Sequence, residues 1–181
     1  MLAFDITEDA PEPQILAWGM RHPWRRSRDE PTGTLLFAEP NFTGKFQEVN
    51  AFARDANYGW GAADPVNAPC WIRPELTVAP QCDRGPDGQQ LTPPLAEYGP
   101  SDGLIIAGAH VARDAAPAAL RDRLVAAEWG VSSTGRAGRG RLLASDPLPA
   151  GALTAPILFN SVKIADPRPD GVFWSLMRDA A

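Results

Sequence analysis

The chain has 181 residues, of which 44% are hydrophobic and 22% charged, values that are typical of a folded globular protein and exclude wholesale disorder. A formal net charge of −5 gives no general attraction to phosphate backbones, so we do not expect nucleic acid as a partner. The longest nearly apolar run, residues 104–112, is far shorter than the roughly 20 residues of a membrane-spanning helix, so no membrane span is expected.

Residues 1–32 contain four Pro, six acidic residues and a cluster of Arg around Trp18 and Trp24. This composition predicts an N-terminal arm, which we expect to attach to the body through burial of Trp18 and Trp24. Residues 33–181 are then a single β-rich domain. The first ten residues have acids where a Sec signal peptide has a basic start and an apolar stretch. The expected location is therefore the cytoplasm or an assembled particle.

Two short strands are predicted at Thr34–Glu39 and Lys45–Asn50, joined by a turn at residues 40–44. Within them Phe37, Phe42 and Gly44 have the spacing aromatic, four residues, aromatic, one residue, glycine. This pattern resembles the opening of a βγ-crystallin Greek key, and the resemblance covers residues 32–78. It implies an aromatic residue packed on a folded hairpin turn. The calcium-binding pattern of that family has no match, so the resemblance implies no calcium site.

Residues 57–100 are rich in Gly, Pro, Asn and Asp, with one possible strand at Trp71–Val78. Such a stretch is typical of a functional loop region or a surface for a partner. Tyr58 and Trp60 alternate with two glycines. If exposed, this pair is a platform for sugars or for a partner's hydrophobic anchor, and if buried it is a small satellite core.

The two cysteines, Cys70 and Cys82, allow two interpretations. A disulfide between them would close a short loop and contribute about 3 kcal/mol. Two separate reduced thiols are the alternative, and we expect the thiols. With only two His residues in addition, the sequence has no metal-binding spacing, so we predict no metal and no cofactor.

The second half begins with a buried strand at Gly103–Val111, followed by one amphipathic helix at Asp114–Trp129. The helix is predicted from the spacing of Leu120, Leu124 and Ala127. Further strands are expected at residues 141–144, 157–165 and 172–177, the last two as a hairpin. The predicted fold is mainly β (α+β), with antiparallel sheets in a sandwich or Greek-key-like arrangement and one helix.

Two further groups of residues are candidate sites. His110, paired with Asp114 or Glu97, is the candidate acid–base centre if the protein is an enzyme. Arg136, Arg139 and Arg141 lie in a Gly-rich segment that is either a solvated loop or a surface for an acidic partner.

The leading functional hypothesis is a non-enzymatic β-rich binding or structural module in a larger assembly, such as a virion, tail or surface complex. Its expected partner is another protein or further copies of itself. The alternative is a small enzyme with the acid–base site centred on His110.

Overall fold

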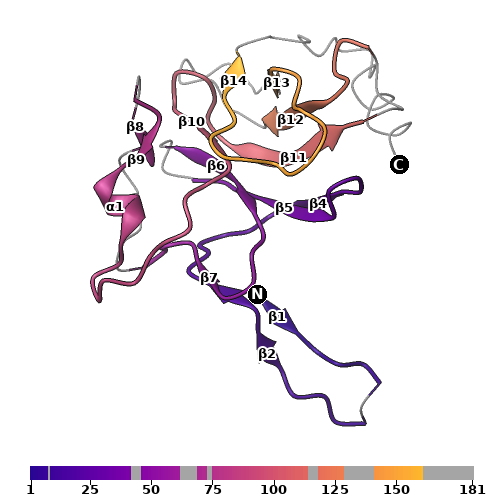
Figure 1. The fold of residues 1–181 in the computed structure, drawn as a ribbon, viewed down its shortest axis with the longest axis vertical. Coiled ribbons are helices and arrows are strands. Elements are labelled where there is room, and N and C mark those ends of the chain that lie inside the picture. The colour runs from indigo at the N-terminus through magenta and orange to yellow at the C-terminus, as the bar shows by residue number, and fades with distance from the viewer. Residues whose placement is uncertain are drawn as a thin grey trace.

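The computed structural model describes residues 1–7, 9–41, 46–61, 69–72, 75–113, 118–128 and 141–160. Within these residues the fold is mainly β, with two four-stranded antiparallel sheets and one short helix, α1 (Pro80–Asp83) (Figure 1). The predicted fold class is confirmed. No helix in the described residues has the length and apolar character needed to cross a membrane.

The first sheet has the strand order β10-β6-β5-β4. Its strands are β4 (Arg26–Asp29), β5 (Thr34–Glu39), β6 (Gln47–Ala51) and β10 (Ala96–Tyr98). The hairpin predicted from the first two strand candidates is confirmed as the antiparallel pair β5–β6. Phe37 of the crystallin-like pattern is buried in β5, whereas Phe42 and Gly44 lie outside the described residues, so that resemblance stays a prediction.

The second sheet has the order β11-β12-β13-β14. Its strands are β11 (Ile106–Ala112), β12 (Arg123–Glu128), β13 (Arg141–Ser145) and β14 (Phe159–Asn160). The strands predicted at Gly103–Val111 and at residues 141–144 are confirmed. Of the strand predicted at residues 157–165, the structure describes β14, and the final hairpin at residues 172–177 lies outside the described residues.

The helix predicted at Asp114–Trp129 is wrong, because residues 123–128 form strand β12. Burial alternates along this strand, with Leu124, Ala126 and Glu128 buried and the residues between them less so. This is the two-residue period of a strand. Leu and Ala fit both periods, and the antiparallel pairing of β12 with β11 shows that the strand is formed.

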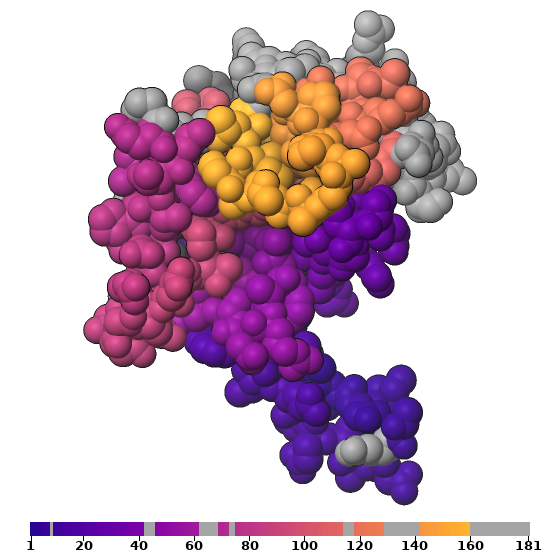
Figure 2. All heavy atoms as spheres, viewed as in Figure 1, coloured from indigo at the N-terminus to yellow at the C-terminus, as the bar shows by residue number. Residues whose placement is uncertain are grey.

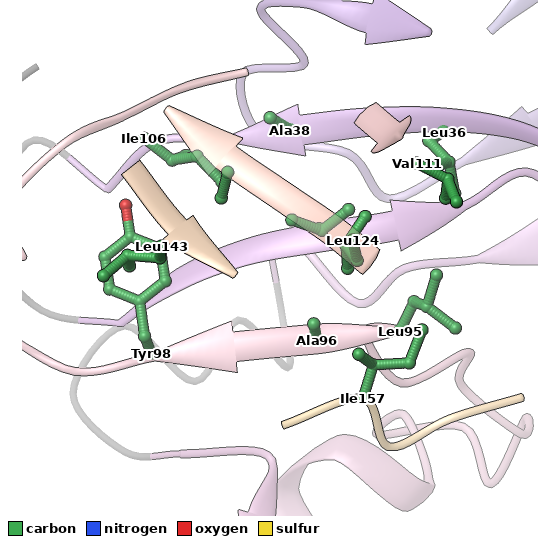
Figure 3. Close-up of a cluster of buried hydrophobic side chains, with 12 residues drawn as sticks. Leu36, Ala38, Leu95, Ala96, Tyr98, Ile106, Val111, Leu124, Leu143 and Ile157 are labelled. Atoms are coloured by element: carbon green, nitrogen blue, oxygen red, sulfur yellow. The ribbon is translucent and has the colours of Figure 1, made fainter. Parts of the chain in front are cut away.

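The hydrophobic core lies between the two sheets, which pack face to face as a sandwich (Figure 3). Leu36 and Ala38 alternate on the inner face of β5, opposite Val111 and Leu124 of the second sheet. Polar links cross the same interface. The Ser27 hydroxyl donates to the Ala109 carbonyl at 2.7 Å, and the buried Gln47 side chain accepts from the Ile106 amide at 3.1 Å.

The first 18 residues form a projecting hairpin and its root. Strands β1 (Leu2–Ala3) and β2 (Gln14–Ile15) pair in the hairpin, which extends away from the body (Figures 1 and 2). Its root, β3 (Ala17–Trp18), pairs in parallel with β7 (Ala56–Asn57).

This arrangement corrects the predicted arm at residues 1–32. Residues 26–29 are already strand β4 of the first sheet, so only the hairpin projects. The expected burial of Trp18 and Trp24 is wrong, because these side chains are 43% and 45% exposed. The hairpin extends away from the body (Figure 2), and both indoles line an open groove at its base.

A disulfide joins Cys70 to Cys82, so the expectation of two reduced thiols is wrong. The strand predicted at Trp71–Val78 is observed as two short paired strands, β8 (Trp71–Ile72) and β9 (Thr77–Val78). This pairing returns the chain to α1 and places the Cα atoms of the two cysteines 5.5 Å apart, within the usual range for a disulfide.

Candidate functional site

Three glutamates lie side by side on the first sheet. The register pairs Glu39 of β5 with Glu48 of β6, and Glu48 with Glu97 of β10. Directly paired residues of neighbouring strands point to the same face, and like charges in such pairs are destabilising unless other groups compensate them. This row lies on the face opposite the sandwich core, because Leu36 and Ala38 alternate with Phe37 and Glu39 along β5.

Backbone amides compensate the two outer carboxylates. Glu39 accepts from the amides of Arg21 and His22 at 2.7 and 2.8 Å, and from the Asn50 side chain at 3.2 Å. Glu97 accepts from the amides of Cys70 and Trp71 at 2.9 and 3.0 Å. Hydrogen bonds of this kind stabilise buried carboxylates. Among the residues that the structure describes, no group of three His, Cys, Asp or Glu side chains is placed to hold a metal ion.

A crevice with a cavity volume of about 40 Å³ opens over Glu39 and Glu48. Arg21 lines it, and its Nη1 atom is buried with no hydrogen-bond partner in the part of the chain that the structure describes. A buried donor without an acceptor costs about 1–3 kcal/mol. The other walls come from the disulfide, α1 and the segment before β10.

Trp60 stands at the mouth of this crevice with 53% of its surface exposed. The flanking Gly59 and Gly61 have φ values of 87° and 105°, a region that favours glycine. The Trp60 amide donates to the Gly19 carbonyl at 2.8 Å, which fixes the backbone beneath the indole. Of the two alternatives left open for Trp60, an exposed platform and a buried satellite core, the structure shows the exposed one.

Tyr58, the other aromatic of the predicted pair, supports the fold from within. Its hydroxyl donates to the Ala51 carbonyl at 2.8 Å and accepts from the Ala53 amide at 3.0 Å. Its ring meets Phe37 edge to face, with centroids 5.1 Å apart. Burial raises the pKa of its phenol. The Tyr58 ring therefore forms part of the crevice wall, and its hydroxyl is hydrogen-bonded to the backbone of Ala51 and Ala53.

The acid–base site predicted around His110 is not assembled in the described residues. His110 lies on β11 of the second sheet. Glu97 lies on β10 of the first sheet, and both of its carboxylate oxygens accept hydrogen bonds from backbone amides. Asp114 lies outside the described residues. Partial burial of the imidazole lowers the pKa of His110, and the nearby Asp29 carboxylate opposes this shift. That carboxylate binds Arg113 through both oxygens.

The remaining predicted binding residues are distributed elsewhere. Trp18 and Trp24 line a separate open groove at the root of the hairpin. Arg136 and Arg139 lie outside the described residues, and Arg141 begins β13, where its backbone pairs with Glu128.

Sequence reasoning missed Arg21, Glu39 and Glu48 as members of one site. One pattern was available for Glu39. Glu39 is two residues after Phe37 in β5, so both side chains lie on the same face of the strand. An acidic residue on the same face as a large apolar one is a signal of a buried carboxylate. The chain pairs with β7 at residues 17 and 18 and then runs to Glu39, where the Arg21 amide donates to the carboxylate. This path brings Arg21 to the crevice, and no local sequence pattern reveals it.

No family model matches this chain, and no curated protein matches it. It is similar, at 18% identity and a TM-score of 0.45, to the PQQ-bound aldose sugar dehydrogenase of Streptomyces coelicolor, covering 81% of this chain and 32% of that one. It is similar, at 18% identity and a TM-score of 0.48, to a glucose dehydrogenase, covering 79% of this chain and 36% of that one. The chain thus spans about a third of either structure.

Both of these similar proteins are enzymes, which corrects the expectation of a non-enzymatic binding or structural module in a larger assembly. That hypothesis is not carried forward. The likeness concerns part of a fold, and it assigns no reaction, cofactor or site residue to this chain.

Proposed function

We propose that the chain binds a small uncharged molecule with several hydroxyl groups, such as a sugar or a cyclitol, at the crevice between Arg21, the glutamate row and Trp60. The buried Nη1 of Arg21 carries this proposal, because it is a donor that has no acceptor among the described residues. The proposal assigns a class of ligand to this crevice.

The hydrogen-bonding chemistry of the crevice favours hydroxyl groups. Arg21 can only donate, whereas the carboxyl groups of Glu39 and Glu48 offer acceptor oxygens. A hydroxyl can accept from the guanidinium and donate to a carboxylate, so a ligand with neighbouring hydroxyls can contact both kinds of group at once. Charge supports the same choice. One guanidinium and two carboxylates line the crevice, a balance that disfavours an anionic ligand.

The size of the crevice determines how such a ligand would lie. One water molecule needs about 10–15 Å³ of free space, so a cavity of about 40 Å³ admits one hydroxymethyl group or a pair of hydroxyls. The ring of the ligand would remain at the mouth. There the half-exposed indole of Trp60 offers an apolar face to the C–H side of the ring.

The test is calorimetric titration of the protein with a panel of neutral hexoses, pentoses and cyclitols, with gluconate as the anionic comparison. Trp60→Ala is expected to weaken binding about tenfold through loss of the apolar face, and Arg21→Met at least as much through loss of the donor. Arg21→Met keeps the backbone amide that holds Glu39.

Two variants serve as matched controls. Trp18→Ala removes an indole of similar exposure from the groove, and Arg26→Met removes a guanidinium there, so both should bind the panel like the original chain. Far-UV circular dichroism checks that each variant is folded. Absence of binding by every neutral compound, or tighter binding of gluconate, would overturn the proposal.

A further inference from the structure

The projecting hairpin exposes more apolar surface than a solvated hairpin would. Leu2, Phe4, Ile6 and Ile15 are 54%, 53%, 90% and 66% exposed, although β1 and β2 contribute only two paired residues each. A short two-stranded hairpin is marginally stable in water. Clustered exposed apolar side chains mark surfaces that bind a partner.

An open groove of about 950 Å³ lies where this hairpin joins the body. Trp18 and Trp24 line it with Phe37 and with Leu2 and Ile15 from the base of the hairpin, and Arg25 and Arg26 add two guanidinium groups. A volume near the upper end of the roughly 300–1,000 Å³ found for ligand sites leaves room for several apolar side chains. The groove therefore combines aromatic surface with positive charge.

Charge is segregated between the hairpin and the groove. Residues 1–20 contain four acids and no Lys or Arg, whereas residues 21–28 contain four Arg and no acid. Within the described residues, no ion pair joins Asp9 or Glu12 of the hairpin to Arg25 or Arg26. The hairpin points away from the body, so the two charged surfaces do not meet in one chain (Figure 2).

We propose that two copies of this chain form a two-fold dimer in which the hairpin of each copy occupies the Trp18–Trp24 groove of the other. A two-fold interface requires each surface to meet its complement on the partner. Both complements, an acidic apolar hairpin and a basic aromatic groove, are present on this one chain. Phe4 and Ile6, which lie beyond the paired residues of the hairpin and do not line the groove of their own chain, would pack on the two indoles, and the acids of the hairpin would face Arg25 and Arg26. This inference is independent of the proposed ligand.

The reciprocal geometry permits a charge-exchange experiment on the full chain. In the groove variant, Arg25→Glu with Arg26→Glu, both hairpin and groove are acidic. In the hairpin variant, Asp9→Lys with Glu12→Lys, both are basic. Asp5 is left unchanged because its carboxylate accepts from the Thr7 amide and hydroxyl at the hairpin tip. Each variant alone should dimerise at least tenfold more weakly than the original chain, measured by sedimentation equilibrium.

Mixing the two variants decides the question. In a mixed dimer each hairpin meets a groove of opposite charge, so an equimolar mixture should regain the affinity of the original chain. Ile6→Ser, at a residue that is 90% exposed, should weaken the dimer while leaving the far-UV circular dichroism of the chain unchanged. Arg28→Glu with Arg121→Glu is the control for charge alone, because neither residue lines the groove.

Three outcomes would overturn the proposal. The original chain could sediment as a monomer at all concentrations, the mixture could remain monomeric while both variants are folded, or the control could dissociate as much as the groove variant.

Discussion

The Arg113 guanidinium donates two parallel hydrogen bonds of 2.8 Å to the Asp29 carboxylate, although the two residues are 84 positions apart in the sequence. Asp29 is fully buried in β4, and Arg113 follows β11, so the pair joins the two sheets at one end of the sandwich. Asp29 also accepts from the Thr32 hydroxyl, and Arg113 reaches Asp122 at 3.1 Å. The paired arrangement raises the pKa of Arg113 further, with Asp29 as its main cause.

Arg113→Ala is expected to lower the free energy of unfolding by about 3–5 kcal/mol, because it leaves a buried carboxylate without its cation. Arg28→Ala is the matched control. It removes the exposed pair with Glu30, and pairs of this kind contribute about 0–1 kcal/mol. Urea denaturation followed by tryptophan fluorescence measures both. A similar, small effect for the two variants would show that the buried pair does not hold the sheets together.

The same pair predicts a dependence of stability on pH. Hydrogen bonding to Arg113 lowers the pKa of Asp29 below its ordinary value of 3.8. A carboxyl whose pKa is lower in the folded state stabilises the fold at pH above its unfolded pKa, and this contribution is lost as pH falls through the folded pKa. We therefore expect the free energy of unfolding to fall below about pH 4. Asp29→Asn should be less stable at neutral pH and should show a smaller decrease in acid.

Gly19 and Gly33 offer a matched pair, since both have a φ of 70°. A Cβ atom at Gly19 would lie 2.0 Å from Asn57 Oδ1 and 2.7 Å from the Gly59 amide nitrogen, whereas at Gly33 it would meet only the Arg28 side chain at 4.0 Å. Gly33→Ala should cost about 1–2 kcal/mol from the backbone alone. Gly19→Ala adds about 1–3 kcal/mol from overlap. Thermal unfolding of both proteins tests this difference, which should vanish if the Gly19 turn rearranges freely.

Removal of the disulfide by Cys70→Ala with Cys82→Ala is expected to cost about 3 kcal/mol, because the closed loop restricts the unfolded chain. Thiol titration of the unfolded protein should detect no free thiol before reduction and two afterwards. The control is the original chain treated with reductant, whose unfolding midpoint should approach that of the double variant. Two free thiols before reduction would contradict the bonded pair.

Local patterns in the sequence were sufficient for short apolar strands bounded by turn residues. In β5, apolar residues and a turn rich in Pro, Asn and Gly defined the strand and its hairpin partner. The segment that became β12 was misread as a helix because Leu120, Leu124 and Ala127 fit a helical spacing equally well. Pairing with β11 and β13 decided between the two, and such pairing is a tertiary effect.

The crevice was predicted in part for a related reason. Local sequence singled out Trp60 on its glycine turn, but it did not decide between an exposed and a buried side chain. The register of β5 and β6 pairs Glu39 with Glu48, and the path of the chain after β3 brings Arg21 beside them. Neither effect can be recognised from local sequence. The disulfide likewise depends on the β8–β9 hairpin, which positions Cys70 beside Cys82.

The parallel pairing of β3 with β7 has a consequence for the order in which the chain folds. Its two strands enclose β4, β5 and β6 between them, so they can meet only after that antiparallel sheet has formed and shortened the distance between their ends. We therefore expect the root of the hairpin to fold last and to open first. The amides of Asp55 and Tyr58, which donate to the carbonyls of Leu16 and Trp18, should exchange with deuterium before those of β5.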